Sequence, residues 1–400
     1  MSGEQPWISA AEAAALLGVS RTTLYAYVSR GFLRSQLAPG SPRERNYARD
    51  DIDRLKRRTE ERRAPDKAAA RALHWGLPTL ESSITLIDRQ RLYYRGRDVL
   101  AMARRRSVAD VAALIWTGQF DASFITHVSL DRLPRIEQRS FIAAAQATLA
   151  EAAARDPRAF DTRPERVATT GWTILMLLTG VATRDHRRGA TIDAALARAW
   201  RVNARGMSIL RAALIVSADH ELNVSSFTAR CVASAGSHPY AAVIAGLAAL
   251  EGPRHGGASA RVTSMFEALR KGRSLRASIS DRLRRGEAIE GFGHPLYADG
   301  DPRARLLLDL IREQYPSSAE YRFVSDLANA ATAATREHPN LDFGLAAVAR
   351  LLKLPAGAPL MLFAIGRTIG WIGQAIEQYA TGQLIRPRAK YVGVPVTATE

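Results

Sequence analysis

The sequence is short of the residues that build disulfides and metal clusters. Cys231 is the only cysteine among 400 residues, so no disulfide can form within the chain and no CxxC pair is present. We expect this thiol to be buried and inert. There is no HExxH motif either, so the sequence predicts neither a metal ion nor a bound cofactor.

Long apolar runs are missing as well. The longest apolar windows, residues 240–250 and 360–372, are too short to cross a bilayer or are interrupted by Arg367. The first residues, MSGEQP, are polar and lack the apolar core of a signal peptide. These absences predict a cytoplasmic protein that does not engage a membrane.

Nucleotide-binding signatures are also absent, since neither a Walker GxxxxGK nor a GxGxxG occurs. Hydrophobic residues make up 47% and charged residues 24% of the chain, as in an ordinary globular protein, and its length suggests two or three domains. The net charge of +17 is spread along the chain, with +5 on residues 1–75. Charge alone therefore does not separate nucleic acids from small polyanions as partners.

The first segment has the pattern of two short helices joined by a tight turn. Ser9 can cap a helix over residues 10–17, Gly18 can make the turn, and Ser20 can cap a second helix over residues 21–30. A polar hairpin and a closing helix, DDIDRLKRR, follow. The pattern resembles the winged helix-turn-helix of the MerR and excisionase type.

This resemblance implies a small DNA-binding domain at residues 1–60. It directs four side chains toward DNA bases or phosphates: Arg21, Thr22, Thr23 and Tyr25. A helical interaction module that no longer binds DNA is the alternative.

The rest of the chain is dominated by helical spacing. A charged, alanine-rich stretch broken by Pro65 suggests a linker at residues 61–75. Apolar positions at Ile84, Leu86 and Leu92 indicate a short hairpin. Beyond it, apolar residues recur at intervals of three and four, as in the windows 143–154, 190–214 and 324–335. We expect a large all-α body that is split by a smaller inserted domain.

Six segments of this body place a histidine or a charged residue among apolar or glycine neighbours. In GFGHPLYADGDPR, glycines and prolines disfavour both helix and strand, so a shaped loop should present His294 and Arg303 together. The planar fork of arginine matches a carboxylate. The other segments are DHELNVSSF with His220, GPRHGGAS with His255, HPNLDFG with Asp342, FAIGRTIGW with Arg367 and LIRPRAKYVG with Arg386.

Each segment alone has an ordinary structural explanation. His220 could be a hydrogen-bonded core histidine, and Asp342 could cap a helix that begins near Phe343. Arg367 could be a buried ion-pair partner, and Arg386 could be a charge at a helix end. The six segments together are better explained by one binding site.

Taken in their order along the chain, the six segments resemble citrate synthase, and the resemblance extends over residues 76–393, with YRGRDV in its opening segment. The resemblance implies an almost wholly helical homodimer with a citrate synthase fold. Its large domain would comprise residues 76–257 and 354–400, and its small domain, residues 258–353, would close over the substrates.

The implied activity is that of an acyltransferase that converts the acyl group into an alkyl group on transfer. Acetyl-CoA condenses with oxaloacetate and water to give citrate and CoA through a citryl-CoA intermediate, at the entrance to the tricarboxylic acid cycle. Acetyl-CoA is a substrate here, so no cofactor is implied. A thioester methyl group is far less acidic than a carboxylic acid, so the enolate must be stabilised as it forms.

The resemblance also implies residue roles. Asp342 would remove the methyl proton, His255 would donate a hydrogen bond to the thioester oxygen, and His294 would polarise the oxaloacetate carbonyl. The implied oxaloacetate ligands are His220, Arg303, Arg367 and, from the other subunit, Arg386. The implied CoA contacts are made largely by backbone at Ile289, Glu290, Gly291, Phe292 and Gly293.

The chain departs from the family pattern at several places. Arg254 stands where the family usually has Leu, and Ser259 where it usually has Asn, which puts the shape and charge of the acyl pocket in doubt. Residues 237–239 also replace a usually acidic segment, and the N-terminal module lies outside the pattern.

Two other functions therefore stay open. One is a 2-methylcitrate synthase that uses propionyl-CoA, because one methylene in a pocket discriminates by only about 1–3 kcal/mol. The other is a metabolite-sensing, DNA-binding regulator built on a citrate synthase scaffold.

Overall fold

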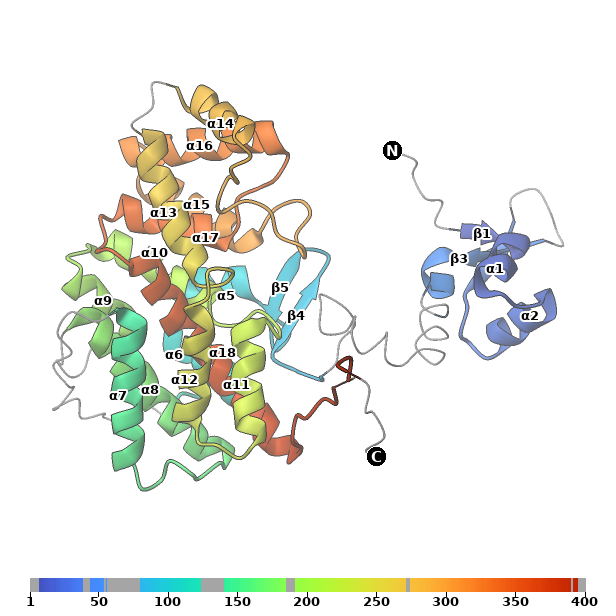
Figure 1. Cartoon of the computed structure of the whole chain (residues 1–400), viewed down its shortest axis with the longest axis horizontal. Coiled ribbons are helices and arrows are strands. Elements are labelled where there is room, and N and C mark those ends of the chain that lie inside the picture. Colours follow the sequence, from blue (N-terminus) through green and yellow to red (C-terminus); the bar gives the residue numbers. More distant parts are fainter. Residues whose placement is uncertain are drawn as a thin grey trace. The chain divides into compact units, whose positions relative to one another are not determined.

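The structure, a computed structural model, describes residues 7–38, 44–53, 55, 80–123, 140–184, 191–270, 274–389 and 391–394. The chain divides into two compact units, Met1–Glu81 and Ser82–Glu400, whose elements are labelled in Figure 1. The expected linker at residues 61–75 lies outside the described residues. Within the described ranges, we find no helix long and apolar enough to span a membrane.

The first unit combines two helices with a three-stranded antiparallel sheet in the order β1-β3-β2. A small core holds it together, formed by Ile8, Ala13, Leu24, Leu33, Tyr47 and Ile52. Its elements are β1 (Trp7–Ser9), α1 (Ala10–Leu17), α2 (Arg21–Ser29), β2 (Ser35–Leu37) and β3 (Arg45–Ala48).

The two helices have the predicted starts because serine side chains cap them. Ser9 Oγ accepts the backbone N–H of Glu12 at 3.3 Å, and the Glu12 carboxylate accepts the backbone N–H of Ser9 at 3.0 Å. Gly18 ends α1 in the left-handed conformation with φ of 63°, which glycine adopts without strain. Ser20 Oγ then accepts the N–H of Thr23 at 3.2 Å at the start of α2.

The second unit opens with the predicted hairpin. β4 (Thr85–Asp88) pairs antiparallel with β5 (Arg91–Tyr94), which also pairs with β6 (Arg97–Asp98). Ile84 and Leu92 are buried, but Leu86 is 55% exposed and takes no part in the core.

Helices make up nearly all of the rest of this unit, as the sequence predicts. The 190–214 window is divided into two of them, α9 and α10. The helices are α5 (Val99–Arg105), α6 (Val108–Thr117), α7 (Phe141–Arg155), α8 (Pro164–Thr183), α9 (Ile192–Ala199), α10 (Ala204–Val216), α11 (Val224–Ser234), α12 (Pro239–Leu250), α13 (Gly257–Arg270), α14 (Leu275–Arg284), α15 (Pro302–Gln314), α16 (Ala319–Thr335), α17 (Leu341–Leu351) and α18 (Ala358–Thr381).

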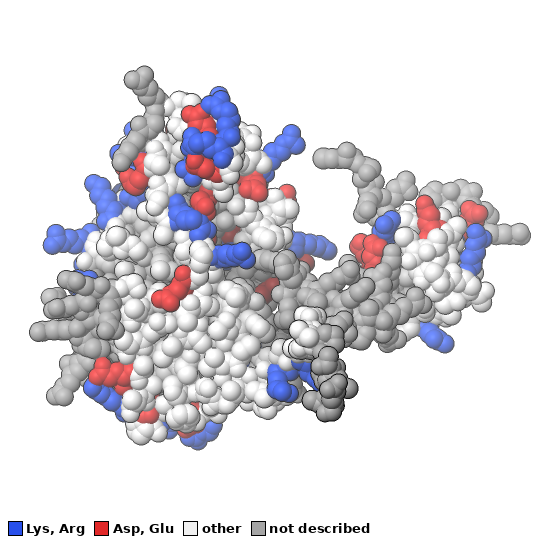
Figure 2. Space-filling view, viewed as in Figure 1, with Lys and Arg blue, Asp and Glu red and all other residues white. Residues whose placement is uncertain are grey.

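Charged side chains of both signs are scattered over the surface of this unit. Figure 2 shows basic side chains scattered among acidic ones over the visible face rather than gathered in one patch. The surface therefore agrees with the spread of charge along the sequence.

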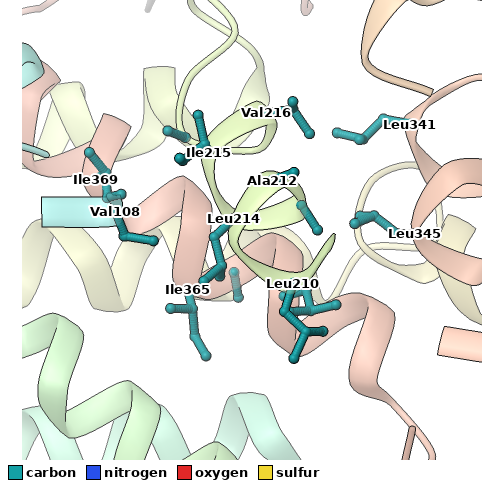
Figure 3. Close-up of a cluster of buried hydrophobic side chains, with 14 of the residues drawn as sticks. Val108, Leu210, Ala212, Leu214, Ile215, Val216, Leu341, Leu345, Ile365 and Ile369 are labelled. Atoms are coloured by element: carbon teal, nitrogen blue, oxygen red, sulfur yellow. The ribbon is translucent and has the colours of Figure 1, made fainter. Parts of the chain in front are cut away.

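The core of the second unit is built around α10 and α18. Figure 3 shows side chains of α10 lying between those of α18 and α17. All of the labelled side chains are buried, and each apolar side chain of this size contributes roughly 1.5–3 kcal/mol when it leaves water. The labelled residues are Val108, Leu210, Ala212, Leu214, Ile215, Val216, Leu341, Leu345, Ile365 and Ile369.

Two glycines of α18 let the end of α10 and the segment after it approach unusually closely. A Cβ atom at Gly366 would lie 2.5 Å from the carbonyl oxygen of Leu214, and one at Gly370 would lie 2.3 Å from that of Ala218. The N–H of Gly370 donates to this Ala218 oxygen at 2.9 Å. The close contact holds Arg367, on α18, beside the segment that carries His220.

Gly370→Ala should lower the free energy of unfolding by about 1–3 kcal/mol, because the added methyl group collides with backbone that cannot move cheaply. Urea unfolding measures the effect. Gly257→Ala is the matched control, since a Cβ there would come no nearer than 3.5 Å to atoms outside its own helix. Equal stability of the two variants would contradict the close approach.

Candidate active site

The segment GFGHPLYADGDPR forms an irregular loop before α15, as predicted. Gly291 and Gly293 take left-handed φ values of 83° and 76°. The N–H of Gly293 donates to the carbonyl oxygen of His338 at 2.9 Å, and the N–H of Asn340 donates to that of Gly291 at 2.9 Å. These bonds fasten the loop to HPNLDFG, so two of the six segments lie side by side.

One buried carboxylate, that of Asp301, joins this loop to two helices. Its Oδ1 accepts the backbone N–H of Arg303 at the start of α15, and its Oδ2 accepts the N–H of Leu341 at the start of α17, at 2.9 and 3.1 Å. The same carboxylate accepts two hydrogen bonds from the Arg303 guanidinium, from Nε at 2.9 Å and from Nη2 at 2.7 Å. Burial alone would raise the pKa of Asp301, but the Arg303 guanidinium outweighs it and holds that pKa below its usual value.

His294 and His220 lie together around Tyr297. The two imidazole centroids are 5.2 Å apart, and His220 Nε2 lies 2.9 Å from the Tyr297 hydroxyl. His294 Nδ1 accepts the N–H of Leu296 at 3.1 Å, which leaves the proton of the neutral ring on Nε2. Burial, helped by the charge of Arg303, lowers the pKa of His294 to about 4. His294 is therefore neutral at pH 7 and has a donor at Nε2.

Asp342 lies at the second position of α17. The sequence alternative that it caps this helix is wrong, because Asn340 is the N-cap and its side chain accepts the N–H of Asp342 at 3.1 Å. The Asp342 carboxylate accepts a 2.6 Å hydrogen bond from Ser259 Oγ. Burial raises the pKa of Asp342, and the Ser259 hydrogen bond and the charge of Arg303 offset only part of that rise.

His255 stands just before α13 and contacts α11 and α18. Its Nε2 lies 2.8 Å from Ser225 Oγ, and its ring packs edge-on against Phe363 at a centroid distance of 5.7 Å. Burial, with a further contribution from the charge of Arg367, lowers the pKa of His255 to about 4. This histidine is therefore also neutral at pH 7.

Arg367 is buried on α18, with 1% of its surface exposed. Its Nε donates to the carbonyl oxygen of Ser217 at 2.7 Å, and its guanidinium lies 4.7 Å from the centroid of the Phe363 ring. Burial lowers its pKa to about 10, so it stays charged at neutral pH. Among the described residues its Nη1 has no hydrogen-bond partner. A buried donor of this kind can receive an anion.

The structure does not bring Arg386 to the other residues of this chain. Arg386 is exposed in the segment after α18 and makes no hydrogen bond or ion pair with the described residues. It also lies beyond the end of α18 at Thr381, so it is not a helix-end charge.

The expected CoA segment lies directly before the His294 loop. The side chains of Ile289 and Phe292 are 7% and 9% exposed, and Glu290 pairs with Arg261 at 3.0 Å. Gly291 and Gly293 offer backbone alone. The segment therefore presents mainly backbone groups to a ligand, and its role stays a prediction.

In the first unit, the residues expected at DNA differ in exposure. Arg21, Thr22 and Tyr25 are exposed on α2, with Tyr25 at 54%. Thr23 is partly buried, and its hydroxyl lies 2.9 Å from the hydroxyl of Ser20. Three of the four side chains are thus available on one short helix.

Sequence reasoning missed several residues of the site. Tyr297 and Ser225 lie inside the segments quoted from the sequence, close to predicted site histidines. A polar side chain at such a position is the signal that could have identified them. Asp219, directly before His220 in the same segment as Ser225, offered this signal too. It is fully buried, and burial raises its pKa to about 6 although Arg367 opposes the shift.

The described part of the chain contains no group of three or more His, Cys, Asp or Glu side chains placed to hold a metal ion. Cys231 is partly buried, and burial raises the pKa of its thiol. The expectation of no cofactor stays a prediction.

Comparison with known families assigns the fold. The family model described as citrate synthase, C-terminal domain, matches residues 72–388. The chain belongs to the citrate synthase family. A second model, a helix-turn-helix domain, matches residues 7–60, ahead of the citrate synthase region. Both resemblances seen in the sequence are confirmed.

Relatives within the citrate synthase family carry two kinds of name. Citrate synthase 2 of Bacillus subtilis (strain 168) is 37% identical over 184 residues, which cover 45% of this chain and 50% of that protein. The 2-methylcitrate synthase 2 of Corynebacterium glutamicum is 30% identical over 261 residues, which cover 60% and 68%. The chain spans about half the length of several curated relatives that it matches.

Solved citrate synthases share the fold. The Thermotoga maritima enzyme superposes with a TM-score of 0.68 at 24% identity, covering 81% of this chain and 96% of that one. Citrate synthase from Thermoplasma acidophilum, solved in a ternary complex with carboxymethyl coenzyme A and oxaloacetate, superposes with a TM-score of 0.67 at 23% identity and the same coverage. The predicted citrate synthase fold is therefore confirmed.

Asp301→Ala should lower the free energy of unfolding by about 3–5 kcal/mol, because it leaves a buried guanidinium without its partner. Asp301→Asn should cost less, since its one amide oxygen can still accept from one of the two helix N-termini. Urea unfolding at neutral pH measures both variants.

The matched control is Asp281→Ala. Asp281 also pairs with an arginine, Arg284, but on the surface, where such pairs contribute at most about 1 kcal/mol. If Asp301→Ala lowered the free energy of unfolding no more than this control does, Asp301 would not hold the site together.

Proposed function

We propose that this protein is a citrate synthase, which condenses acetyl-CoA with oxaloacetate and water to citrate and CoA. The observation that carries the proposal is the arrangement around Asp301. Its carboxylate holds Arg303 and the start of α17, next to Asp342, while the attached loop supplies a neutral His294. An anion-binding group, a base and a proton donor are thus fixed by one buried carboxylate.

The first proposed step removes a proton from the methyl group of acetyl-CoA. The Asp342 carboxylate accepts it, and its raised pKa brings its basicity closer to what the reaction needs. The electron pair moves onto the thioester oxygen as the enolate forms. In the reacting complex the Ser225 hydroxyl, which donates to Asn223 Oδ1 in the structure, would turn its hydrogen toward Nε2 of neutral His255. The ring N–H at Nδ1 would then donate to the thioester oxygen.

The second step forms the carbon–carbon bond. The enolate carbon attacks the ketone carbonyl of oxaloacetate while Nε2–H of His294 polarises the carbonyl oxygen and then protonates the alkoxide. Water finally attacks the thioester of citryl-CoA, the carbon–sulfur bond breaks, and citrate and the CoA thiol leave. Each histidine acts as a neutral donor, which agrees with the lowered pKa values of both.

Oxaloacetate carries two carboxylates, for which we propose Arg303, Arg367 and His220 as ligands. The unpartnered Nη1 of Arg367 and its burial support this assignment. We also propose a homodimer in which Arg386 reaches the site of the other subunit, since it is exposed and makes no hydrogen bond or ion pair with the described residues of its own chain. A cytoplasmic location, the first reaction of the tricarboxylic acid cycle and CoA contacts at residues 289–293 complete the proposal.

A thiol-release assay with oxaloacetate and acetyl-CoA tests the activity. Asp342→Asn keeps the shape of the side chain but removes the base, so kcat should fall by roughly 100-fold or more. Asp326→Asn, an exposed position on α16, is the control and should keep wild-type activity. No thiol release by a folded wild-type protein would refute the proposal.

The same assay with propionyl-CoA decides between citrate and 2-methylcitrate synthesis. Relatives of both names match the chain. The extra methylene of propionyl-CoA should change kcat/KM by about 10–200-fold if the acyl pocket is built for one substrate. We propose acetyl-CoA as the better substrate, and a higher kcat/KM for propionyl-CoA would reassign the enzyme.

A second function, DNA binding, is favoured by the helix-turn-helix match and by the exposed face of α2. We propose that this unit binds duplex DNA, and that a dimer would engage half-sites about 34 Å apart or a multiple of that. The citrate synthase unit could then sense metabolites for a regulator.

Binding to duplexes selected from a random-sequence pool tests this second function. The affinity should fall steeply with salt, and Arg21→Ala should weaken it by about 10-fold or more if Arg21 contacts a base or phosphate. Arg276→Ala, an exposed arginine on α14, is the control. A pool that yields no preferred duplex at any salt concentration would favour the interaction-module alternative.

A further inference from the structure

Ser259, on α13, is a buried serine that makes a hydrogen bond to Asp342. It is 2% exposed, and its Oγ lies 2.6 Å from Oδ1 of Asp342 on α17. A carboxylate can only accept, so the hydroxyl is the donor. The bond joins residues that are 83 positions apart in the sequence.

We propose that Ser259 is a positioning residue for Asp342, whose hydroxyl fixes the carboxylate so that Oδ2 faces the acyl methyl group. The inference rests on the proposed function, in which Asp342 is the base. Oδ1 is occupied by the serine, whereas Oδ2 makes no hydrogen bond with the described residues. The serine thereby selects the oxygen that receives the proton.

The same bond adjusts the basicity of Asp342. Burial raises its pKa, and Ser259 is the first of the groups that lower it. The charges facing the carboxylate are Arg303 on α15 and Arg261 on α13, which lower the pKa, and Asp301, which raises it. Ser259 therefore opposes the rise in the pKa of Asp342 and favours the ionised form of this carboxylate.

Ser259 and His255 both belong to the segment at the start of α13. His255 stands four positions earlier, immediately before α13, so the donor to the thioester oxygen and the support of the base belong to one short segment. Ser259 stands where the family usually has Asn. A serine hydroxyl reaches less far than an asparagine amide, so the short 2.6 Å bond requires α13 and α17 to lie close together here.

The test is the pH profile of kcat for Ser259→Ala in the thiol-release assay. Loss of a hydrogen bond to a charged group should move the acidic limb upward by about one pH unit. The plateau of kcat should fall by about 10-fold or more, because the carboxylate is no longer held. KM for oxaloacetate should stay near the wild-type value, since no oxaloacetate ligand is changed.

Three further variants separate positioning from packing. Ser259→Thr keeps the hydroxyl, so the acidic limb of its pH profile should coincide with that of the wild type. Ser259→Cys has a weaker donor of similar shape, so its acidic limb should shift by less than that of Ser259→Ala. Ser264→Ala, exposed on the same helix, is the matched control. If Ser259→Ala fails to fold, the cysteine variant decides the question.

Two failures are distinguishable. A wild-type protein without thiol release, or an Asp342→Asn variant of full activity, overturns the proposed function and the inference with it. An active wild type that depends on Asp342, together with Ser259→Ala and Ser259→Cys profiles that coincide with the wild type, overturns the positioning role alone.

Discussion

The buried ion pair between Asp301 and Arg303 is the interaction on which the site depends. A buried carboxylate is costly unless its oxygens are fully used, and those of Asp301 accept from the Arg303 guanidinium and from the first turns of α15 and α17. The positive ends of both helices and the guanidinium favour the charged form. Arg303 and the start of α17, which carries Asp342, are thus fixed by one group.

The other half of the site depends on close packing rather than on charge. Gly366 and Gly370 allow the backbone of residues 214–218 to lie against α18. Arg367 is held between these glycines, and its Nε is bound to Ser217. Together the ion pair and the glycine contact place two buried arginines in the site. Burial lowers the pKa of His220, and the charges of Arg303 and Arg367 lower it further.

Features that depend on residues close together in the sequence could be predicted from it. Ser9, Gly18 and Ser20 set helix ends through neighbouring backbone groups, and these boundaries agree with the structure. The loop carrying His294 was predicted from its glycines and prolines. The contact of Ser259 with Asp342 could not be predicted, because it joins residues far apart and neither spacing nor composition reports it. The helix start at Asn340 was misjudged by two positions, since Asn and Asp are both good caps.

Burial and charge together set the protonation states of the site. Burial disfavours a positive charge on His220 and His294, and the positive charges of Arg303 and Arg367 add to this, so the pKa values are lowered and both rings stay neutral. In the proposed reaction, the two carboxylates of oxaloacetate compensate both arginines. His294 then becomes easier to protonate once the substrate is bound, which suits a group that must give a proton to an alkoxide and recover it. Burial, together with the same charges that would bind the substrate, thus holds these donors neutral until the substrate carboxylates arrive.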